Sequence, residues 1–168
     1  MIFKKRSKQN LQWKVLKYVE EASDPWNMLK VGRENRKCQL IFEVLKKSKT
    51  VLDLGGGFGF YSEYLRTLGK YVICYDLSKR MVMQGRRIHP KLSFVRGDGC
   101  ILPFRSESFD GVLCMGTMIY INNKSSLTSE IYRILTSDGR LCLIERNRYS
   151  PLHLFLSFMG VRGPVNEY

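Results

Sequence analysis

Short apolar segments rich in β-branched residues alternate with helical segments from residue 51 to residue 144, and this alternation restricts the fold more than any other feature. The apolar runs predict five strands, at 51–54, 71–75, 92–95, 111–115 and 140–144. Helical patterns lie between them, at 60–68, 79–88 and 125–135. Strands that are apolar at successive positions and separated by helices are typical of a parallel sheet covered on both faces. We therefore predict a doubly wound α/β domain.

The residues before this alternation predict a basic, helical segment. Apolar positions recur on one helical face from 10 to 22, and a second helix is expected at about 34–47. The chain has a net charge of +13, and residues 1–50 hold 13 basic against 5 acidic side chains. Such a segment can bind the phosphates of RNA or anionic lipid headgroups, or it can be a solvated surface. RNA is therefore a candidate partner of the N-terminal segment.

Composition limits the class of protein. With 168 residues, 44% of them hydrophobic, the chain can form one domain with a buried core. The longest apolar runs fall short of the roughly 20 residues that span a bilayer, and no apolar region of a secretory signal follows the basic start. The five cysteines are an odd number without a Cys-x-x-Cys pair, which predicts no metal site. We expect a cytoplasmic protein without a membrane span.

The first predicted strand runs straight into the glycine-rich sequence DLGGGFG at residues 53–59, and a helix begins near Phe60. We call residues 55–59 the glycine loop. Glycines are needed where φ is positive or where a Cβ would collide with a ligand. The free N–H groups of a helix start also favour a negative group. The alternative is a tight strand-to-helix turn that binds nothing. Because ligands of such sheets bind beyond the carboxyl ends of the strands, the loop is a candidate binding site.

Two carboxylates follow the next two strands and favour a nucleoside ligand. Asp76 lies about 20 positions beyond the loop, where it can accept hydrogen bonds from both hydroxyls of a ribose. Asp98 can accept the exocyclic amino hydrogens of an adenine, although a turn or cap residue is the alternative. The dinucleotide spacing Gly-x-Gly-x-x-Gly fails, because its third glycine would fall at Phe60 or Ser62. An adenosine ligand without phosphates is therefore favoured.

Five motifs occur in order between about residues 48 and 146. They are Asp53-x-Gly55-x-Gly57-x-Gly59, Tyr75-Asp76-Leu77-Ser78 with Met81, Gly97-Asp98 ahead of Leu102-Pro103-Phe104, Ser108-Phe109-Asp110-Gly111-Val112, and Glu130-Ile131-Tyr132-Arg133-Ile134-Leu135 leading to Asp138-Gly139-Arg140-Leu141. Together they resemble class I S-adenosylmethionine-dependent methyltransferases, most of all the branch of ubiquinone and menaquinone biosynthesis. The resemblance implies a Rossmann-like core, S-adenosylmethionine as cofactor and S-adenosylhomocysteine as product.

By this resemblance the glycine loop holds the methionine part of the cofactor, Asp76 the ribose, and Asp98 with its neighbours the adenine. Met115 and Gly116, which close the fourth strand, line the methionyl side. The implied cofactor-binding residues are Asp53, Gly55, Gly56, Gly57, Gly59, Asp76, Leu77, Asp98, Gly99, Cys100, Met115 and Gly116.

No catalytic side chain is predicted, because methyl transfer from a sulfonium is an in-line displacement that depends on positioning and on excluding water. A general base is needed only if the acceptor must lose a proton. Tyr120 and Glu145, beyond the fourth and fifth strands, are placed to reach the methyl. Alternatively, Tyr120 packs and Glu145 pairs with Arg146 or Arg148. Signatures of exocyclic amino and cytosine methylation are absent, so we expect a small-molecule acceptor ahead of RNA or protein.

We expect one domain, with N-terminal basic helices at 1–47, a cofactor-binding core at 48–146, and a short C-terminal helix and tail at 147–168. A complete class I fold adds another helix and two strands after the fifth strand. Few residues follow Glu145, which predicts that the last strands are lacking and that the fifth strand is an open edge. Either the chain is a fragment, or a second copy completes the sheet in a homodimer.

Three other functions stay open. The chain can be a non-catalytic module that binds S-adenosylmethionine or a partner, or an RNA-binding protein that uses its basic N-terminal segment. An NAD oxidoreductase is the least favoured, because the glycine spacing does not fit it.

Overall fold

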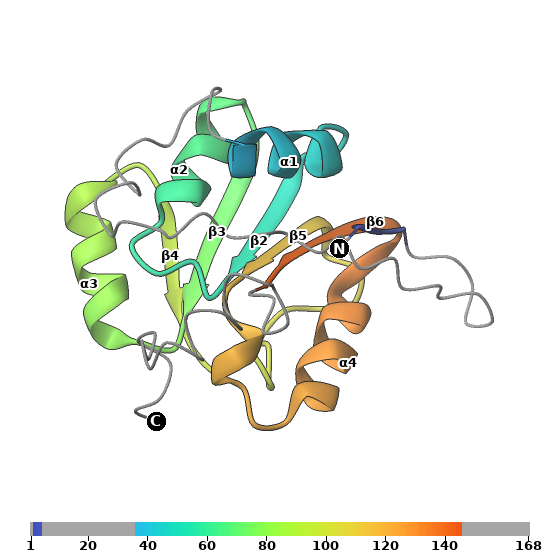
Figure 1. Cartoon of the computed structure of the whole chain (residues 1–168). Coiled ribbons are helices and arrows are strands. Elements are labelled where there is room, and N and C mark those ends of the chain that lie inside the picture. Colours follow the sequence, from blue (N-terminus) through green and yellow to red (C-terminus); the bar gives the residue numbers. More distant parts are fainter. Residues whose placement is uncertain (1, 5–35, 146–168) are drawn as a thin grey trace, which may run out of the picture.

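The computed structural model describes residues 2–4 and 36–145, and its strands form one sheet in the order β1-β6-β5-β2-β3-β4 (Figure 1). Five strands pair in parallel: β2 (Thr50–Leu54), β3 (Tyr71–Asp76), β4 (Ser93–Arg96), β5 (Phe109–Met115) and β6 (Leu135–Ile144). All five strands predicted from the sequence are confirmed, and so is the mainly parallel sheet.

Helices precede and connect these strands where the sequence predicts them, apart from one short 3-10 helix after β5 that it does not predict. They are α1 (Arg36–Leu45), α2 (Phe60–Thr67), α3 (Lys79–Ile88) and α4 (Lys124–Ile134), with the short 3-10 helix η2 (Met118–Tyr120) after β5. Ser78 and Asn123 are the N-caps of α3 and α4, and their side chains accept the N–H groups of Met81 and Ser126. Such caps satisfy donors that have no partner within the helix. The helices predicted at 10–22 and in residues 147–168 lie outside the described residues.

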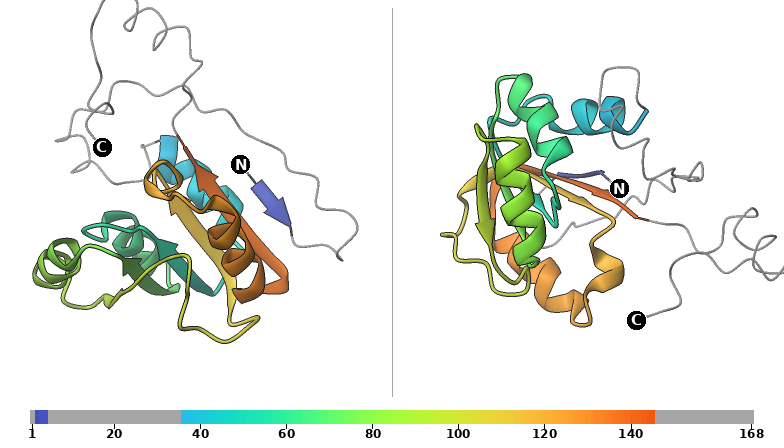
Figure 2. Two further views of the ribbon diagram at one scale, coloured as in Figure 1. Left: turned by 90° about the horizontal axis from the view of Figure 1, so that it is seen from below. Right: turned by 90° about the vertical axis from the view of Figure 1, so that its left-hand side faces the viewer.

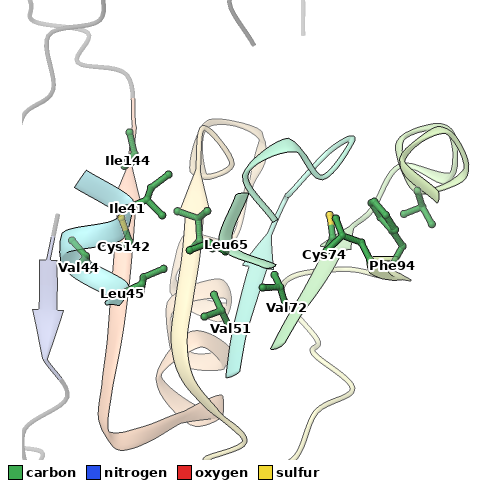
Figure 3. Close-up of a cluster of buried hydrophobic side chains, with 13 residues drawn as sticks. Ile41, Val44, Leu45, Val51, Leu65, Val72, Cys74, Phe94, Cys142 and Ile144 are labelled. Carbon is green, nitrogen blue, oxygen red and sulfur yellow. The ribbon is translucent and has the colours of Figure 1, made fainter. Parts of the chain in front are cut away.

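The helices cover the two faces of the sheet separately. Side chains of α1, α2 and α3 pack with Val51, Cys74 and Leu113 on one face, and side chains of α4 pack with Leu52 and Val112 on the other. Successive strand residues belong to opposite faces because side chains alternate along a strand. In Figure 3 the side chains from α1 and α2 meet those of the strands on the first face. Both faces are thus buried, as a doubly wound sheet requires.

The outer edge of β6 is paired, contrary to expectation. β1 (Ile2–Lys4) runs antiparallel to β6 and pairs with Arg140–Cys142, with Phe3 opposite Leu141 (Figure 2). The prediction of an open edge is therefore wrong at these positions. A strand from the start of the chain lies at this edge, where missing strands or a second copy were expected, and the homodimer stays a prediction.

Within residues 2–4 and 36–145, no helix is long and apolar enough to cross a membrane. The same residues contain no group of His, Cys, Asp or Glu side chains that could hold a metal ion.

Candidate functional site

The parallel order brings the predicted site residues to one edge of the sheet. The neighbours β5, β2, β3 and β4 all present their carboxyl ends there. The glycine loop follows β2, Asp76 ends β3, Asp98 follows β4, and Met115 ends β5. Four loops from distant parts of the sequence thus surround one position, which is where sheets of this type bind ligands.

The glycine loop combines left-handed backbone with close packing at each of its glycines except Gly57. Gly55, Gly57 and Gly59 have φ values of +73°, +58° and +83°, which residues with a Cβ rarely adopt. A Cβ on Gly56 would lie 2.6 Å from Cys74 Sγ, so this glycine faces the protein interior. A Cβ on Gly57 would have no atom within 4 Å. Gly57 therefore exposes bare backbone, as close approach of a ligand requires.

Asp53 lies beneath the loop and supports it. Its side chain is 3% exposed, and its Oδ2 accepts the hydroxyl of Ser62 at 2.6 Å. Burial raises the pKa of Asp53 to about 6, since desolvation disfavours the carboxylate, whereas the Ser62 hydrogen bond favours it. The nearby charge of Asp76 raises this pKa further. The place of Asp53 is that of a buried support under Gly56, and contact with a cofactor stays a prediction.

Asp76 ties the end of β3 to the glycine loop. Its Oδ2 accepts the N–H of Gly57 at 2.9 Å, and its Oδ1 accepts the N–H of Ser78 at 2.8 Å. Two carboxylate oxygens offer about four acceptor positions, so this carboxylate can also accept ribose hydroxyls. The geometry brings the two strongest sequence signals, the loop and the acidic residue, into direct contact.

Apolar side chains are exposed on the side predicted for adenine. Leu77 after β3 is 62% exposed, and Ile101 in the loop after β4 is 77% exposed. Between them in the sequence, Asp98 accepts the N–H of Cys100 through Oδ1 at 2.8 Å. The geometry of Asp98 is therefore compatible with both predictions, a cap of the turn and an acceptor for adenine. One oxygen caps the turn, and the other can still accept hydrogen bonds.

An ion pair on α4 holds the loop that carries Ile101. Glu130 and Arg133 pair at 2.7 Å, and Glu130 Oε2 accepts the N–H of Leu102. Arg133 in turn donates to the carbonyls of Leu102 and Phe104. The loop after β4 is thereby fixed to α4, which keeps Ile101 and Asp98 at the carboxyl edge.

The turn after β5 closes the site on the side of Met115. Gly116 has a φ of +66°, and a Cβ there would have no atom within 4 Å.

Tyr120, at the end of η2, is 71% exposed, so the alternative that it packs is not supported. Glu145 accepts backbone N–H groups of Thr117 and Met118, while its predicted partners Arg146 and Arg148 lie outside the described residues.

The cysteines contribute packing. Cys74, Cys114 and Cys142 are fully buried on strands, as expected. Burial raises the pKa of each of these thiols, that of Cys142 to about 12. Thiols held in this form are poor nucleophiles.

Three residues of this edge were missed by sequence reasoning: Ser62, Ile101 and Thr117. Ile101 carried no signal of its own, since it lies in the apolar run CILPF at residues 100–104, just after Asp98. Ser62 and Thr117 carried none, because their roles depend on contacts with Asp53 and with the glycine loop that only folding creates.

The residues present fit an adenosine-type cofactor. Gly57 and Gly116 leave open space over bare backbone, Asp76 has acceptor capacity beside the loop, and Leu77 and Ile101 expose apolar surface that a flat base can cover.

Comparison with known proteins places this architecture among methyltransferases. Over 100 residues the chain is 32% identical to the demethylmenaquinone methyltransferase of Streptomyces griseus, covering 60% of this chain and 44% of that protein. Over 127 residues it is 32% identical to the malonyl-[acyl-carrier protein] O-methyltransferase of Erwinia billingiae, covering 73% and 50%. The chain thus spans about half the length of these curated relatives.

A solved structure shares the fold of this chain, and a family profile agrees with the placement among methyltransferases. The PH0226 protein of Pyrococcus horikoshii OT3 has a TM-score of 0.62 and 25% identity, over 67% of this chain and 58% of that one. The profile of the family described as "Methyltransferase domain" matches residues 52–143, from the middle of β2 to the next-to-last residue of β6. Since this match covers more than half of the chain, the chain belongs to the methyltransferase-domain family.

Proposed function

We propose that the protein binds S-adenosylmethionine at the carboxyl edge of its sheet and transfers the methyl group to a small-molecule acceptor. The observation that carries this proposal is the contact between the glycine loop and Asp76, where the Gly57 N–H meets the carboxylate at 2.9 Å beside open space. Membership of the methyltransferase-domain family supports the same reaction.

The bound cofactor would supply a methyl group already activated by a sulfonium. The chain's own residues would bind and orient it: the glycine loop along the methionine part, Asp76 through ribose hydroxyls, and Leu77 and Ile101 against the adenine. Met115 and Gly116 would line the methionyl side. Catalysis would then come from orientation and exclusion of water.

Calorimetric titration with S-adenosylhomocysteine tests the cofactor half of the proposal. We expect saturable binding and a rise in melting temperature, because a ligand that binds the folded state stabilises it. NADH in a parallel titration should bind more weakly. The absence of heat and of a thermal shift at millimolar S-adenosylhomocysteine would contradict the proposal.

A small molecule is the proposed acceptor. Two curated relatives, named for demethylmenaquinone and for malonyl-[acyl-carrier protein], support an acceptor other than nucleic acid. The class of acceptor can be tested with isotope-labelled S-adenosylmethionine. The protein is incubated with it and with separated lipid, metabolite, RNA and protein fractions of a cell extract. Label in the lipid or metabolite fraction, or in an acyl group released from a carrier protein, is expected, and label confined to RNA or to amino-acid side chains of protein would overturn this part. Cofactor binding without label in any fraction would favour the non-catalytic module.

A further inference from the structure

The carboxylate of Glu145, where β6 ends, binds the backbone of the turn that follows β5. Its Oε1 accepts the N–H of Thr117 at 3.0 Å and the N–H of Met118 at 2.8 Å. Thr117 and Met118 are the N-cap and the first residue of η2. N–H groups at the start of a helix have no partner inside it. Glu145 therefore acts on η2 as an N-cap side chain would, although it follows β6 and lies far from η2 in the sequence.

The same turn supports the glycine loop. Thr117 Oγ1 donates to the carbonyl of Leu54 at 3.1 Å. A Cβ on Gly55 would lie 2.7 Å from Thr117 Cγ2, so the loop and the turn have no spare room between them. A continuous series of contacts runs from Glu145 through Thr117 to the start of the glycine loop.

The second oxygen of Glu145 makes no such bond. Oε2 is buried and has no hydrogen-bond partner among the described residues. Burial also raises the pKa of this carboxyl above its usual range, an effect that its bonds to the Met118 and Thr117 N–H groups oppose. The burial of Oε2 without a partner costs free energy. The two hydrogen bonds that Oε1 accepts offset this cost and keep the carboxylate in this position.

We propose that Glu145 is a positioning residue of the cofactor site, which fixes the turn after β5, and through Thr117 the glycine loop, by accepting two backbone hydrogen bonds. This rests on the proposed function in one respect, namely that the glycine loop binds the cofactor. This role requires a hydrogen-bond acceptor at the position of Oε1, and it requires no negative charge. It also requires no contact between Glu145 and the ligand.

Variants of the full chain test this role: Glu145→Gln, Glu145→Ala, Thr117→Val and the double variant Glu145→Ala/Thr117→Val. Glu43→Gln is the control, because Glu43 is exposed on α1 and pairs with Lys46 there. Calorimetry measures the Kd for S-adenosylhomocysteine. We expect Glu145→Ala and Thr117→Val each to weaken binding about tenfold. The amide oxygen of Gln can accept the same two N–H groups, so Glu145→Gln should stay within about threefold of wild type.

The double variant should bind about as weakly as the weaker single variant, because both substitutions break one series of contacts. In ligand-free ¹⁵N–¹H spectra, the Thr117 and Met118 amide signals should move in Glu145→Ala and stay in Glu145→Gln. If Glu145→Ala fails to fold, Glu145→Gln and Thr117→Val still give the comparison.

Three results would overturn the proposal: wild-type affinity in Glu145→Ala, equal losses in Glu145→Gln and Glu145→Ala, or fully additive losses in the double variant. Failure of the wild type to bind S-adenosylhomocysteine would reject the proposed function instead. The amide signals would then still decide whether Glu145 holds the turn.

Discussion

Asp53 is a buried carboxyl whose ionisation opposes folding at neutral pH. Its pKa of about 6 in the folded chain lies above the ordinary value of 3.8, chiefly because of burial. A group with a raised pKa binds more protons in the folded state, so its contribution to stability is complete below pH 3.8 and is lost as the pH rises through 6. A shift of about two units corresponds to roughly 2–3 kcal/mol over that range.

Asp53→Asn should therefore become more stable relative to wild type as the pH rises, by about 2 kcal/mol between pH 4.5 and pH 8. The amide oxygen can keep the hydrogen bond from Ser62, and the amide does not ionise. Urea unfolding at several pH values measures the difference in free energy of unfolding. A difference that stays flat over this pH range for Asp53→Asn would contradict the assignment of this pKa.

Gly57 and Gly69 form a matched pair for testing the ligand side of the glycine loop. Both have positive φ, +58° and +81°, and a Cβ on either would have no atom within 4 Å. Replacement by Ala should therefore cost similar stability, about 1 kcal/mol, through backbone strain alone.

Gly57→Ala should lose affinity for S-adenosylhomocysteine by about tenfold or more, because its methyl group would enter the space proposed for the ligand. Gly69→Ala, in the turn between α2 and β3, should keep wild-type affinity. Melting temperatures and calorimetric titrations measure the two effects. Equal affinities in both variants would place the ligand elsewhere.

At the scale of the element, α1 depends on a lysine from outside the helix. Lys70 is 9% exposed, and its Nζ donates to the carbonyls of Leu45 at 2.8 Å and Ser48 at 2.7 Å, with Lys46 more distant at 3.3 Å. The last carbonyls of a helix have no partner inside it, and a cation also suits the negative end of the helix dipole. Lys70 thereby joins the end of α1 to the start of β3.

Lys70→Met should lower the free energy of unfolding by about 2 kcal/mol, because the carbonyls lose a charged donor while the apolar stem is retained. Lys47→Met is the control, since Lys47 is exposed on the chain just after α1. Urea unfolding measures both variants. Equal stabilities would show that water satisfies the carbonyls as well as the ammonium does.

Local patterns predicted the parallel core well, because each strand and helix from 51 to 144 carries its own periodicity. The glycine loop and Asp76 were also predictable, since their separation of about 20 residues is fixed by one strand–helix–strand unit. The roles of Thr117 and Glu145 were not, because they bridge β5 and β6 to the loop after β2. β1 was missed as well: three residues are too short to show a strand pattern, and its pairing is not local.

At the scale of the whole molecule, the N-terminal strand β1 covers part of the edge of β6. Phe3→Pro should open this edge, because the proline ring fixes φ at about −65°, far from the value of an antiparallel strand, and removes a backbone N–H. We expect faster amide hydrogen exchange at Arg140–Cys142 and increased self-association in sedimentation velocity, as exposed edges pair with other chains. Phe3→Ala keeps the backbone N–H and should stay close to wild type. Unchanged exchange in Phe3→Pro would contradict the pairing.

The pairing of β1 with β6 also has a kinetic consequence. Lys4 lies opposite Arg140, which is 136 positions later in the sequence. Bringing the ends of so long a segment together lowers the conformational entropy of the chain before the contacts between them can stabilise it. Pairs of this kind therefore form late in folding. Of the other pairs, β2 with β3 and β3 with β4 are each connected through one helix, and β5 with β6 through η2 and α4; only β2 with β5 has a longer connection among the described strands. The parallel core can therefore assemble first, and the chain's first strand then adds to a sheet that is already built.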